Sequence, residues 1–410
     1  MLNIECSPFM RIALVSQEYP PETAKGGIGT QTFLKAHGLA ALGHEVHVIS
    51  RNTKDKSSSR TDHGVQVTRV PGFEGRMQIF TEAADWLTYS GEVAVAVAAL
   101  HAKSPFDVVD FPEWGAEGYV HLLNRTEWNR IPTVIHLHGP LVMFAHTMDW
   151  PELDSEFYRT GTMMEGTCVR LADAVFSSSQ CSADWCAKHY EVNRQAIPVI
   201  HTGVDTELFS PRDVPRAARP TIIFAGKLAR NKGVHLLADA AVRLANEFPG
   251  LQLRLLGRGE PKILDELKNL VQSANVPDLL DAPGFVDRAE LPAHFSRAHV
   301  FAAPSEYEGG PGFVYLEAMA CGLPVIACAG SGAAEVVRQN VNGLLVPPQN
   351  VEALTAALRL LLKDEASREK MGGFARRFVL AEADSRACIQ KLEAFYAAVA
   401  NRVKQNQSMP

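Results

Sequence analysis

The segment 303–332, APSEYEGGPGFVYLEAMACGLPVIACAGSG, joins a glycine-rich turn, two glutamates and a short helical pattern. An apolar run ends at Pro304, glycines fill the turn that follows, and a helix is predicted over 313–321. The first amides of such a helix have no partner within it and carry the positive end of its dipole, so they favour a phosphate. Glu317 lies about one turn inside, where its carboxylate suits a neutral diol beside the phosphates. The segment therefore predicts a diphosphate and ribose site; the alternative is a turn whose glycines only let the chain bend.

Two lysines lie near another predicted strand end, in FAGKLARNKGVHLLADA (224–240). Lys227 follows a strand that ends at Gly226, and Lys232 precedes a helix that starts near Gly233. Lysines at a helix start gain nothing from the helix dipole, so a bound diphosphate would explain their placement. The alternative is a solvated basic loop.

Two turns end neighbouring strands of the same predicted sheet, LLGRGEP (255–261) and GFVD (284–287). Ligands of parallel α/β sheets bind at the carboxyl ends of the strands. A nucleotide base is expected to rest against these turns, with Val286 among its contacts.

A glycine loop follows the first strand of the chain, in AKGGIGTQTFLKAHGLA (24–40). Gly27 and Gly29 permit close approach of the backbone to a ligand at the start of a helix. The loop is not a GxGxxG dinucleotide motif. The alternative is that these glycines serve only the turn.

Two histidines end another strand, in VIHLHGP, where strand alternation places His136 and His138 on the same face. A strand-end histidine is more often structural than functional, but His138 directly precedes Gly139 at the predicted rim of a cleft. Neither histidine has a third ligand at metal-like spacing, and the sequence has no DxD or HExxH motif. We predict no metal and no cofactor.

Composition sets the class of protein. The chain has 410 residues, 46% hydrophobic and 21% charged, which suits two or three soluble domains. A net charge of -6 gives no electrostatic reason to expect a nucleic-acid partner. Seven scattered cysteines without a CxxC pair fit free thiols in a reducing compartment, so we expect a cytoplasmic protein. No apolar stretch approaches the roughly 20 residues of a membrane span.

Apolar runs alternate with helical patterns in two series, which is typical of parallel sheets covered on both faces. The first series is 11–16, 45–50, 107–111, 133–138, 174–179 and 198–203; the second is 221–226, 251–257, 299–305, 324–330 and 343–348. The loop 51–62 is expected to be solvated.

The two series predict two Rossmann-like domains that face an interdomain cleft. We place the first at 1–205, a Pro- and Arg-rich linker at 206–220, and the second at 221–384. A helix at 385–403 either closes the second domain or crosses back to the first, and the tail 404–410 is expected to be disordered. Residues 1–9 look extraneous, because the first clear strand begins after Met10.

Taken together and in order, these segments resemble the retaining glycosyltransferases of family 4, which have the GT-B fold. The resemblance covers nearly the whole chain and rests on the GGIG loop, HLHG, VIHTGVDTELFSP (199–211), GKLARNKG, EGGPGFVYLEAMACGLPVIA and NGLLVPP. It implies that the C-terminal domain holds a nucleoside diphosphate sugar and the N-terminal domain the acceptor. It also implies that transfer keeps the anomeric configuration.

The resemblance assigns roles to individual residues. Lys232 and Lys227 match the cations that stabilise the departing diphosphate, and Glu317 matches the glutamate that holds the ribose. His138 matches a histidine beside the transferred sugar. The amides that cradle the distal phosphate match Gly312, Phe313 and Val314, and the loop against the diphosphate and acceptor matches Gly27 and Gly29.

Two departures from the family pattern stand out. Lys227 replaces the usual arginine and gives a point charge in place of a bidentate fork. Eight residues separate Glu308 from Glu317, where the family usually has seven. Glu308 is the preferred grip for the sugar hydroxyls, with Glu306 as its competitor.

The resemblance thus predicts transfer of a hexose-like unit from a UDP- or GDP-sugar to an acceptor hydroxyl, in polysaccharide or glycoconjugate synthesis. The acceptor is expected to be a carbohydrate, a lipid-linked or a small molecule that contacts Glu113 and Trp114, with the protein at most peripheral at the inner membrane face. The alternatives are a nucleotide-sugar epimerase or phosphorylase on the same fold, and a non-catalytic sugar-nucleotide-binding subunit.

Overall fold

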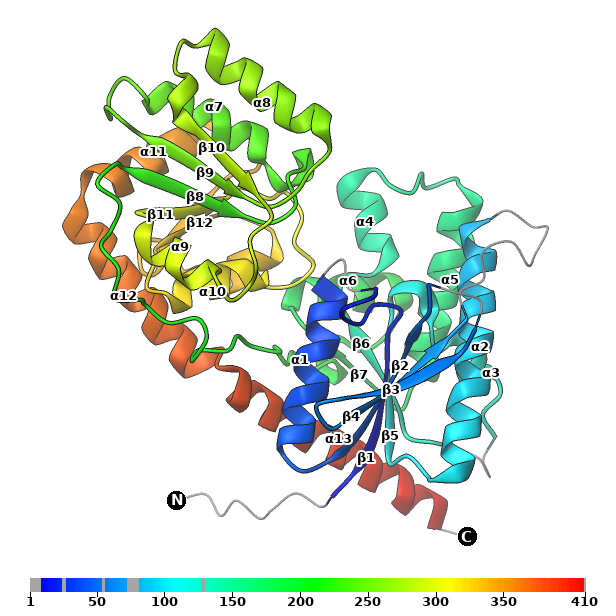
Figure 1. Cartoon of the computed structure of the whole chain (residues 1–410). Coiled ribbons are helices and arrows are strands. Elements are labelled where there is room, and N and C mark those ends of the chain that lie inside the picture. The colour runs from blue at the N-terminus through cyan, green and yellow to red at the C-terminus, as the bar shows by residue number, and fades with distance from the viewer. Residues whose placement is uncertain (1–8, 24–26, 54–55, 72–80, 127–129, 409–410) are drawn as a thin grey trace. The chain divides into compact units, whose positions relative to one another are not determined.

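The computed structural model describes residues 9–23, 27–53, 56–71, 81–126 and 130–408 (Figure 1). The chain divides into two compact units. The first unit comprises Met1–Thr202 with Ser385–Pro410, and the second comprises Gly203–Asp384. The predicted linker 206–220 therefore belongs to the second unit, and the division lies a few residues before it.

A seven-stranded sheet, in the order β3-β4-β2-β1-β5-β6-β7, forms the centre of the first unit. Its strands are β1 (Arg11–Val15), β2 (Glu45–Arg51), β3 (Ser58–Asp62), β4 (Val65–Val70), β5 (Val108–Pro112), β6 (Thr133–Leu137) and β7 (Ala174–Ser177). All neighbours pair in parallel except β3 and β4, which are antiparallel. Alternate residues of β1 enter two different cores, Ile12 on one face and Ala13 on the other, so helices cover both faces.

The helices of the first unit start at residues suited to cap them. Thr81, Ser155 and Ser179 each accept a backbone amide of the first turn that follows. The helices are α1 (Gly27–Ala41), α2 (Glu82–Lys103), α3 (Tyr119–Leu123), α4 (Leu141–Met148), α5 (Glu156–Leu171) and α6 (Gln180–Tyr190), with the 3-10 turns η1 (Trp114–Ala116) and η2 (Arg194–Ala196).

The last helix, α13 (Ser385–Ser408), crosses back to the first unit. Ile389 and Tyr396 are buried with strands β1 and β2, and a Cβ at Gly38 of α1 would lie 2.8 Å from Ile389. The absent side chain at Gly38 lets the two helices approach closely. The helix also continues through Ser408, so the prediction that the chain is disordered from 404 is wrong for 404–408.

The second unit is built on a six-stranded, fully parallel sheet in the order β10-β9-β8-β11-β12-β13. Its strands are β8 (Thr221–Ala225), β9 (Gln252–Leu256), β10 (Leu280–Gly284), β11 (Val300–Ala303), β12 (Val325–Cys328) and β13 (Gly343–Val346). Its helices are α7 (Val234–Leu244), α8 (Pro261–Ser273), α9 (Leu291–Arg297), α10 (Phe313–Ala320), α11 (Val351–Lys363) and α12 (Glu365–Glu382), with the 3-10 turns η3 (Arg230–Lys232), η4 (Pro277–Leu279) and η5 (Gly332–Glu335).

The predicted α/β class with two parallel-sheet units is confirmed, and three local predictions are wrong. The loop 51–62 contains the edge strand β3, whose largely exposed residues carry no apolar pattern. β4 follows it and had not been predicted. The run 198–203 forms only a bridge between Val199 and Ser177, so it is not a strand. Among the described residues, no helix is both long and apolar enough to cross a membrane.

Candidate active site

The loop after β8 lies against two neighbouring loops of the second unit. A Cβ at Gly257 would lie 1.8 Å from the Gly226 carbonyl oxygen, and a Cβ at Gly233 would lie 2.3 Å from that of Pro304. Gly233 also has a φ of 71°, which glycine adopts readily. The close contacts fix the segment between these glycines, in which Lys227 is exposed and Lys232 ends η3.

Lys232 and Glu308 form an ion pair at the end of β11. The Lys232 Nζ lies 2.8 Å from the Glu308 Oε1 and donates a second hydrogen bond of 3.4 Å to the Tyr307 carbonyl. Glu306, the competing glutamate, instead donates its backbone amide to the Asn231 carbonyl. The structure thus brings together two predicted site residues, Lys232 and Glu308.

The glycine-rich turn of this segment packs its backbone against η5. Gly332 donates its amide to the Glu308 carbonyl at 2.9 Å. A Cβ at Gly332 would lie 2.2 Å from the Gly310 carbonyl and 2.7 Å from that of Glu308. Gly332 therefore lets η5 lie close to the glycine-rich turn, because any side chain at this position would clash with the carbonyls of the turn.

Helix α10 begins directly after this turn, at the predicted phosphate site. Gly312 is its N-cap with a φ of 69°, and no described side chain caps the first turn. Phe313 and Val314 supply the first amides, and both residues are half-buried. The position of a Cβ at Gly312 lies 3.8 Å from the Glu308 carboxyl carbon, so a carboxylate stands beside the positive end of this helix.

Glu317 is buried inside α10 and forms an ion pair with Arg288. The Arg288 Nε and Nη2 donate to the same oxygen, Glu317 Oε1, at 3.0 and 2.6 Å. Burial raises the pKa of the Glu317 carboxyl, and the Arg288 guanidinium opposes that rise. Arg288 had not been singled out from the sequence; its signal was a basic side chain just past the GFVD turn.

Val286 follows β10 in the loop predicted to receive the base. It is half-buried against the core of the second unit. Its neighbour Phe285 is 61% exposed, with the Arg258 guanidinium 5.3 Å from the ring centre. An exposed aromatic ring beside a cation suits stacking, and contact of Val286 with a base stays a prediction.

In the first unit, Glu113 holds the backbone that follows β6. Its Oε1 accepts the amides of His138 and Gly139 at 2.7 and 2.6 Å. Glu113 is completely buried, and burial raises its pKa to about 7. A side chain with no exposed surface positions the His138 loop, and contact of Glu113 with an acceptor stays a prediction.

His138 is partly buried at the end of β6. Burial lowers its pKa well below the usual value, and the charge of Lys35 lowers it further, so the imidazole is neutral. Its Nδ1 has no partner among the described residues. Its ring centre lies 4.0 Å from that of His136.

His136 belongs to a buried polar network and is structural. Lys35 pairs with Asp110 at 2.6 Å and donates to His136 Nδ1 at 3.1 Å, while Tyr396 of α13 donates to Asp110. With Nδ1 accepting, the His136 Nε2 donates to Ser178 at 2.8 Å. The network joins α1, β5, β6 and α13 beneath His138.

Trp114 lies in an aromatic cluster next to Glu113. Its ring centre is 4.9 Å from Phe144, 5.7 Å from Trp86 and 6.4 Å from Trp150. Trp150 is 46% exposed, so the cluster reaches solvent. Contact of Trp114 with an acceptor remains a prediction.

The two predicted glycines of the early loop begin α1. Gly27 is exposed, and a Cβ there would meet nothing within 4 Å. Gly29 is buried and donates its amide to the Glu18 carboxylate at 3.3 Å. The part of the loop before Gly27 lies outside the described residues.

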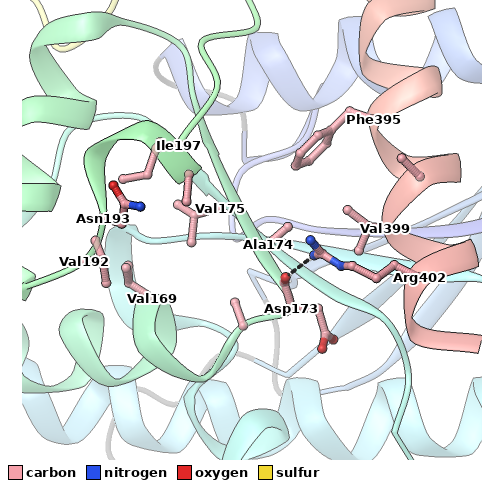
Figure 2. Close-up of a pocket in the computed structure, with 13 residues that line it drawn as sticks. Val169, Asp173, Ala174, Val175, Val192, Asn193, Ile197, Phe395, Val399 and Arg402 are labelled. Carbon is pink, nitrogen blue, oxygen red and sulfur yellow. Dashed lines mark hydrogen bonds between the residues drawn. The ribbon is translucent and has the colours of Figure 1, made fainter. Parts of the chain in front are cut away.

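A cavity of about 490 Å³ lies at the opposite end of the first sheet, where β7 begins (Figure 2). Apolar side chains line most of it, among them Val175 and Val399, and Arg402 of α13 donates to the Asp173 carbonyl at its side. None of the predicted site residues is among its lining residues. In the part of the chain that the structure describes, no three His, Cys, Asp or Glu side chains form a group that could hold a metal.

Comparison with known proteins identifies the family. The model for Glycosyl transferases group 1 matches residues 206–378, and that for Glycosyltransferase Family 4 matches residues 25–208. A D-inositol 3-phosphate glycosyltransferase from Corynebacterium urealyticum is 30% identical over 399 residues, which cover 89% of this chain and 90% of that protein. A glycogen synthase from Mycobacterium tuberculosis is 27% identical over 403 residues, covering 92% and 91%.

Solved structures show the same fold. The sucrose-phosphate synthase of Thermosynechococcus elongatus has a TM-score of 0.80 at 26% identity, covering 96% of this chain and 100% of that one. The sequence motifs, the two parallel-sheet units and the whole-length relatives lead to one conclusion: the chain belongs to glycosyltransferase family 4, with the GT-B fold.

Proposed function

We propose that this glycosyltransferase moves a hexose-like unit from a UDP- or GDP-sugar to an acceptor hydroxyl with retention of configuration. The observation that carries the donor class is the position of the Glu308 carboxylate between Lys232 and the uncapped start of α10. A cation and free helix amides favour an anion there, and the protein's own carboxylate stands in that place. A sugar diphosphate would replace it.

The second unit supplies positive charge where the leaving group forms. As the bond between C1 of the sugar and the diphosphate oxygen breaks, its electron pair stays on the diphosphate. Lys232, Lys227 and the amides of Phe313 and Val314 stabilise that charge. This set of donors is the reason to propose a reaction that needs no metal. Retention of activity in excess EDTA is the expected result.

The acceptor hydroxyl attacks C1 from the face that the diphosphate leaves. Its oxygen forms the new bond to C1, and its proton passes to a leaving phosphate oxygen, so no protein base takes part. The products are the glycosylated acceptor and a nucleoside diphosphate. Glu308 turns from Lys232 to the sugar hydroxyls, and the neutral His138 hydrogen-bonds another hydroxyl of the sugar.

The acceptor is proposed to be a carbohydrate or small polyol, free or lipid-linked. Two relatives are named glycogen synthase and D-inositol 3-phosphate glycosyltransferase, and these names refer to a polysaccharide and to a phosphorylated polyol. The aromatic cluster around Trp114 offers rings for stacking on a sugar face. Synthesis of a polysaccharide or glycoconjugate is consistent with both observations.

Thermal-shift screening against nucleotide sugars is the first experiment, because a true donor raises the melting temperature by mass action. Transfer from the selected donor to an added acceptor is then followed by NMR of the new anomeric proton. The proposal expects one UDP- or GDP-sugar to stabilise the protein and the product to keep the donor's anomeric configuration. If the variants Lys232→Ala and Glu317→Ala fold normally and transfer sugar at the wild-type rate, the site assignment is wrong.

A further inference from the structure

Arg288 and Glu317 meet in an asymmetric way. Both guanidinium hydrogen bonds, from Nε and Nη2, end on Oε1 of Glu317. Among the described residues, none donates a hydrogen bond to Oε2. A bidentate pair would occupy both carboxylate oxygens, whereas this arrangement keeps one available.

Separate contacts hold Arg288 in this position. Its guanidinium carbon lies 4.9 Å from the ring centre of Phe209, which is completely buried. Arg288 starts the short turn between β10 and α9, and its side chain is 35% exposed while that of Glu317 is 7% exposed. The arginine therefore reaches from the surface over an aromatic ring to a buried carboxylate.

Several titratable or charged residues surround Glu317, and Arg288 forms an ion pair with its carboxylate. Cys321 is the C-cap residue of α10, Arg376 of α12 donates to the carbonyls of Phe209 and Ala320, and Arg212 precedes β8. Asp287 and Glu290 flank Arg288 in its own turn. Among the described residues, Arg288 makes the hydrogen bonds recorded for the Glu317 carboxylate.

We infer that Arg288 is a positioning residue for the donor: it occupies Oε1 of Glu317 and reserves Oε2 for the two hydroxyls of a ribose. One carboxylate oxygen has lone pairs for both hydroxyls of a diol. The inference rests on the proposed function and deepens it, because it makes the ribonucleoside, with both hydroxyls, the preferred donor half. Arg288 itself does not touch the sugar that is transferred.

The ionic state of Glu317 gives this role a signature that a merely structural residue lacks. Without the guanidinium, burial alone acts on the carboxyl, and its pKa rises. A protonated carboxyl has fewer acceptor sites for a diol, so nucleotide affinity would weaken at low pH and recover as pH rises. The wild type, in which the Arg288 guanidinium opposes that rise, would change less over the same range.

The test measures dissociation constants of UDP and GDP, and of their 2′-deoxy forms, by calorimetry between pH 6 and 8.5. The full-length variants are Arg288→Met, Arg288→Lys and Glu317→Gln. Arg254→Met is the matched control, because Arg254 pairs with Asp281 at 3.4 Å on the same sheet but outside the site. Melting temperatures show which variants are folded.

We expect Arg288→Met to bind the better ribonucleotide about tenfold more weakly at pH 6.5, to recover toward pH 8.5, and to lose discrimination against the deoxy form. Arg288→Lys, which keeps the charge, restores the wild-type pH profile. Wild-type affinity and the wild-type pH profile in Arg288→Met would overturn the inference while Glu317→Gln still weakens binding. Failure of the wild type to bind either nucleotide would overturn the proposed function instead. If Arg288→Met does not fold, weak and pH-dependent binding by Arg288→Lys equally overturns the inference.

Discussion

The two units use buried glutamates in opposite ways. In the first unit Glu113, Glu117 and Glu165 each accept backbone amides, and each keeps one oxygen without a partner among the described residues. In the second unit Glu308 and Glu317 each face a cation, Lys232 or Arg288. A glutamate that only holds a loop needs no positive partner, whereas the proposed function has Glu317 bind the ribose hydroxyls as an anion with Arg288 beside it.

The ionisation of the first group shows the physical difference. Burial raises the pKa of Glu113 to about 7 and of Glu117 to about 8, and raises that of Glu165 well above its ordinary value. A neutral carboxyl costs less to bury and still accepts an amide through its carbonyl oxygen. The first unit therefore positions His138 at little electrostatic cost, whereas in the second unit the Arg288 guanidinium opposes the rise that burial causes in the pKa of Glu317.

Removal of the Lys232 ammonium group from the second unit should cause the largest loss of transfer activity. Lys232→Ala is expected to lower the transfer rate about 1000-fold, or roughly 4 kcal/mol, because the departing diphosphate loses a preorganised donor. Steady-state assays with the selected donor measure this loss. Arg230→Ala is the control: Arg230 lies in the same short helix but pairs with Glu266. Equal rates in both variants would contradict the assignment of Lys232.

A rise in pH should have the second-largest effect, which is a loss of stability in the first unit. Glu117 has a folded pKa above the unfolded value of 4.5, so its stabilising contribution is complete below pH 4.5 and lost as pH rises toward 8. Between pH 5 and 8 this costs about 3 kcal/mol of unfolding free energy. Urea unfolding should show the decline in the wild type and a weaker one in Glu117→Gln. Parallel curves for the two proteins would mean that Glu117 titrates normally.

A side chain at Gly332 should displace the glycine-rich turn of the second unit without changing any charged residue. Gly332→Ala places a Cβ against the carbonyls of Gly310 and Glu308 and displaces the turn. We expect donor affinity to fall about tenfold, within the usual cost of overpacking. Gly373→Ala is the control, because its Cβ would meet only Arg377 at an ordinary 3.5 Å. The same nucleotide dissociation constant in both variants would contradict the account of the longer turn.

The smallest expected effect concerns acceptor binding alone, so it distinguishes the acceptor site from the donor site. Trp114→Leu should raise the acceptor KM about fivefold, since stacking of a ring contributes about 1 kcal/mol, and leave nucleotide affinity unchanged. Trp185→Leu is the control, with a tryptophan that stacks on His189 in α6. An unchanged acceptor KM in Trp114→Leu would remove this cluster from the acceptor site.

Much of the fold and site could be predicted because strand ends carry strong local signals. Apolar runs marked most strands, and the glycines around Lys232 and Gly312 lay where the sequence placed them. Edge strand β3 escaped because its sequence SSRTD has no buried face. The run 198–203 is apolar, but it forms only one β-bridge, and composition does not predict whether an apolar run finds neighbours to pair with.

The sequence did not predict which side chains pair with one another in each unit, and the three-dimensional structure was needed to identify them. Lys35, Asp110 and Tyr396 come from three distant segments, and no spacing rule connects them. Glu113 in DFPEWGAEG was expected to contact the acceptor, but its buried carboxylate accepts the two backbone amides that directly follow β6. Sequence patterns locate the ends of strands, but not which charges meet there.

The central claim is that the Glu308 carboxylate occupies the place of the donor phosphates, between Lys232 and the start of α10. The most direct measurement is the affinity of UDP and GDP for the wild type and for Glu308→Gln, compared by calorimetry. The account predicts that the better nucleotide binds Glu308→Gln several-fold more tightly, because Lys232 is released from its ion pair. Equal or weaker binding by Glu308→Gln would contradict it.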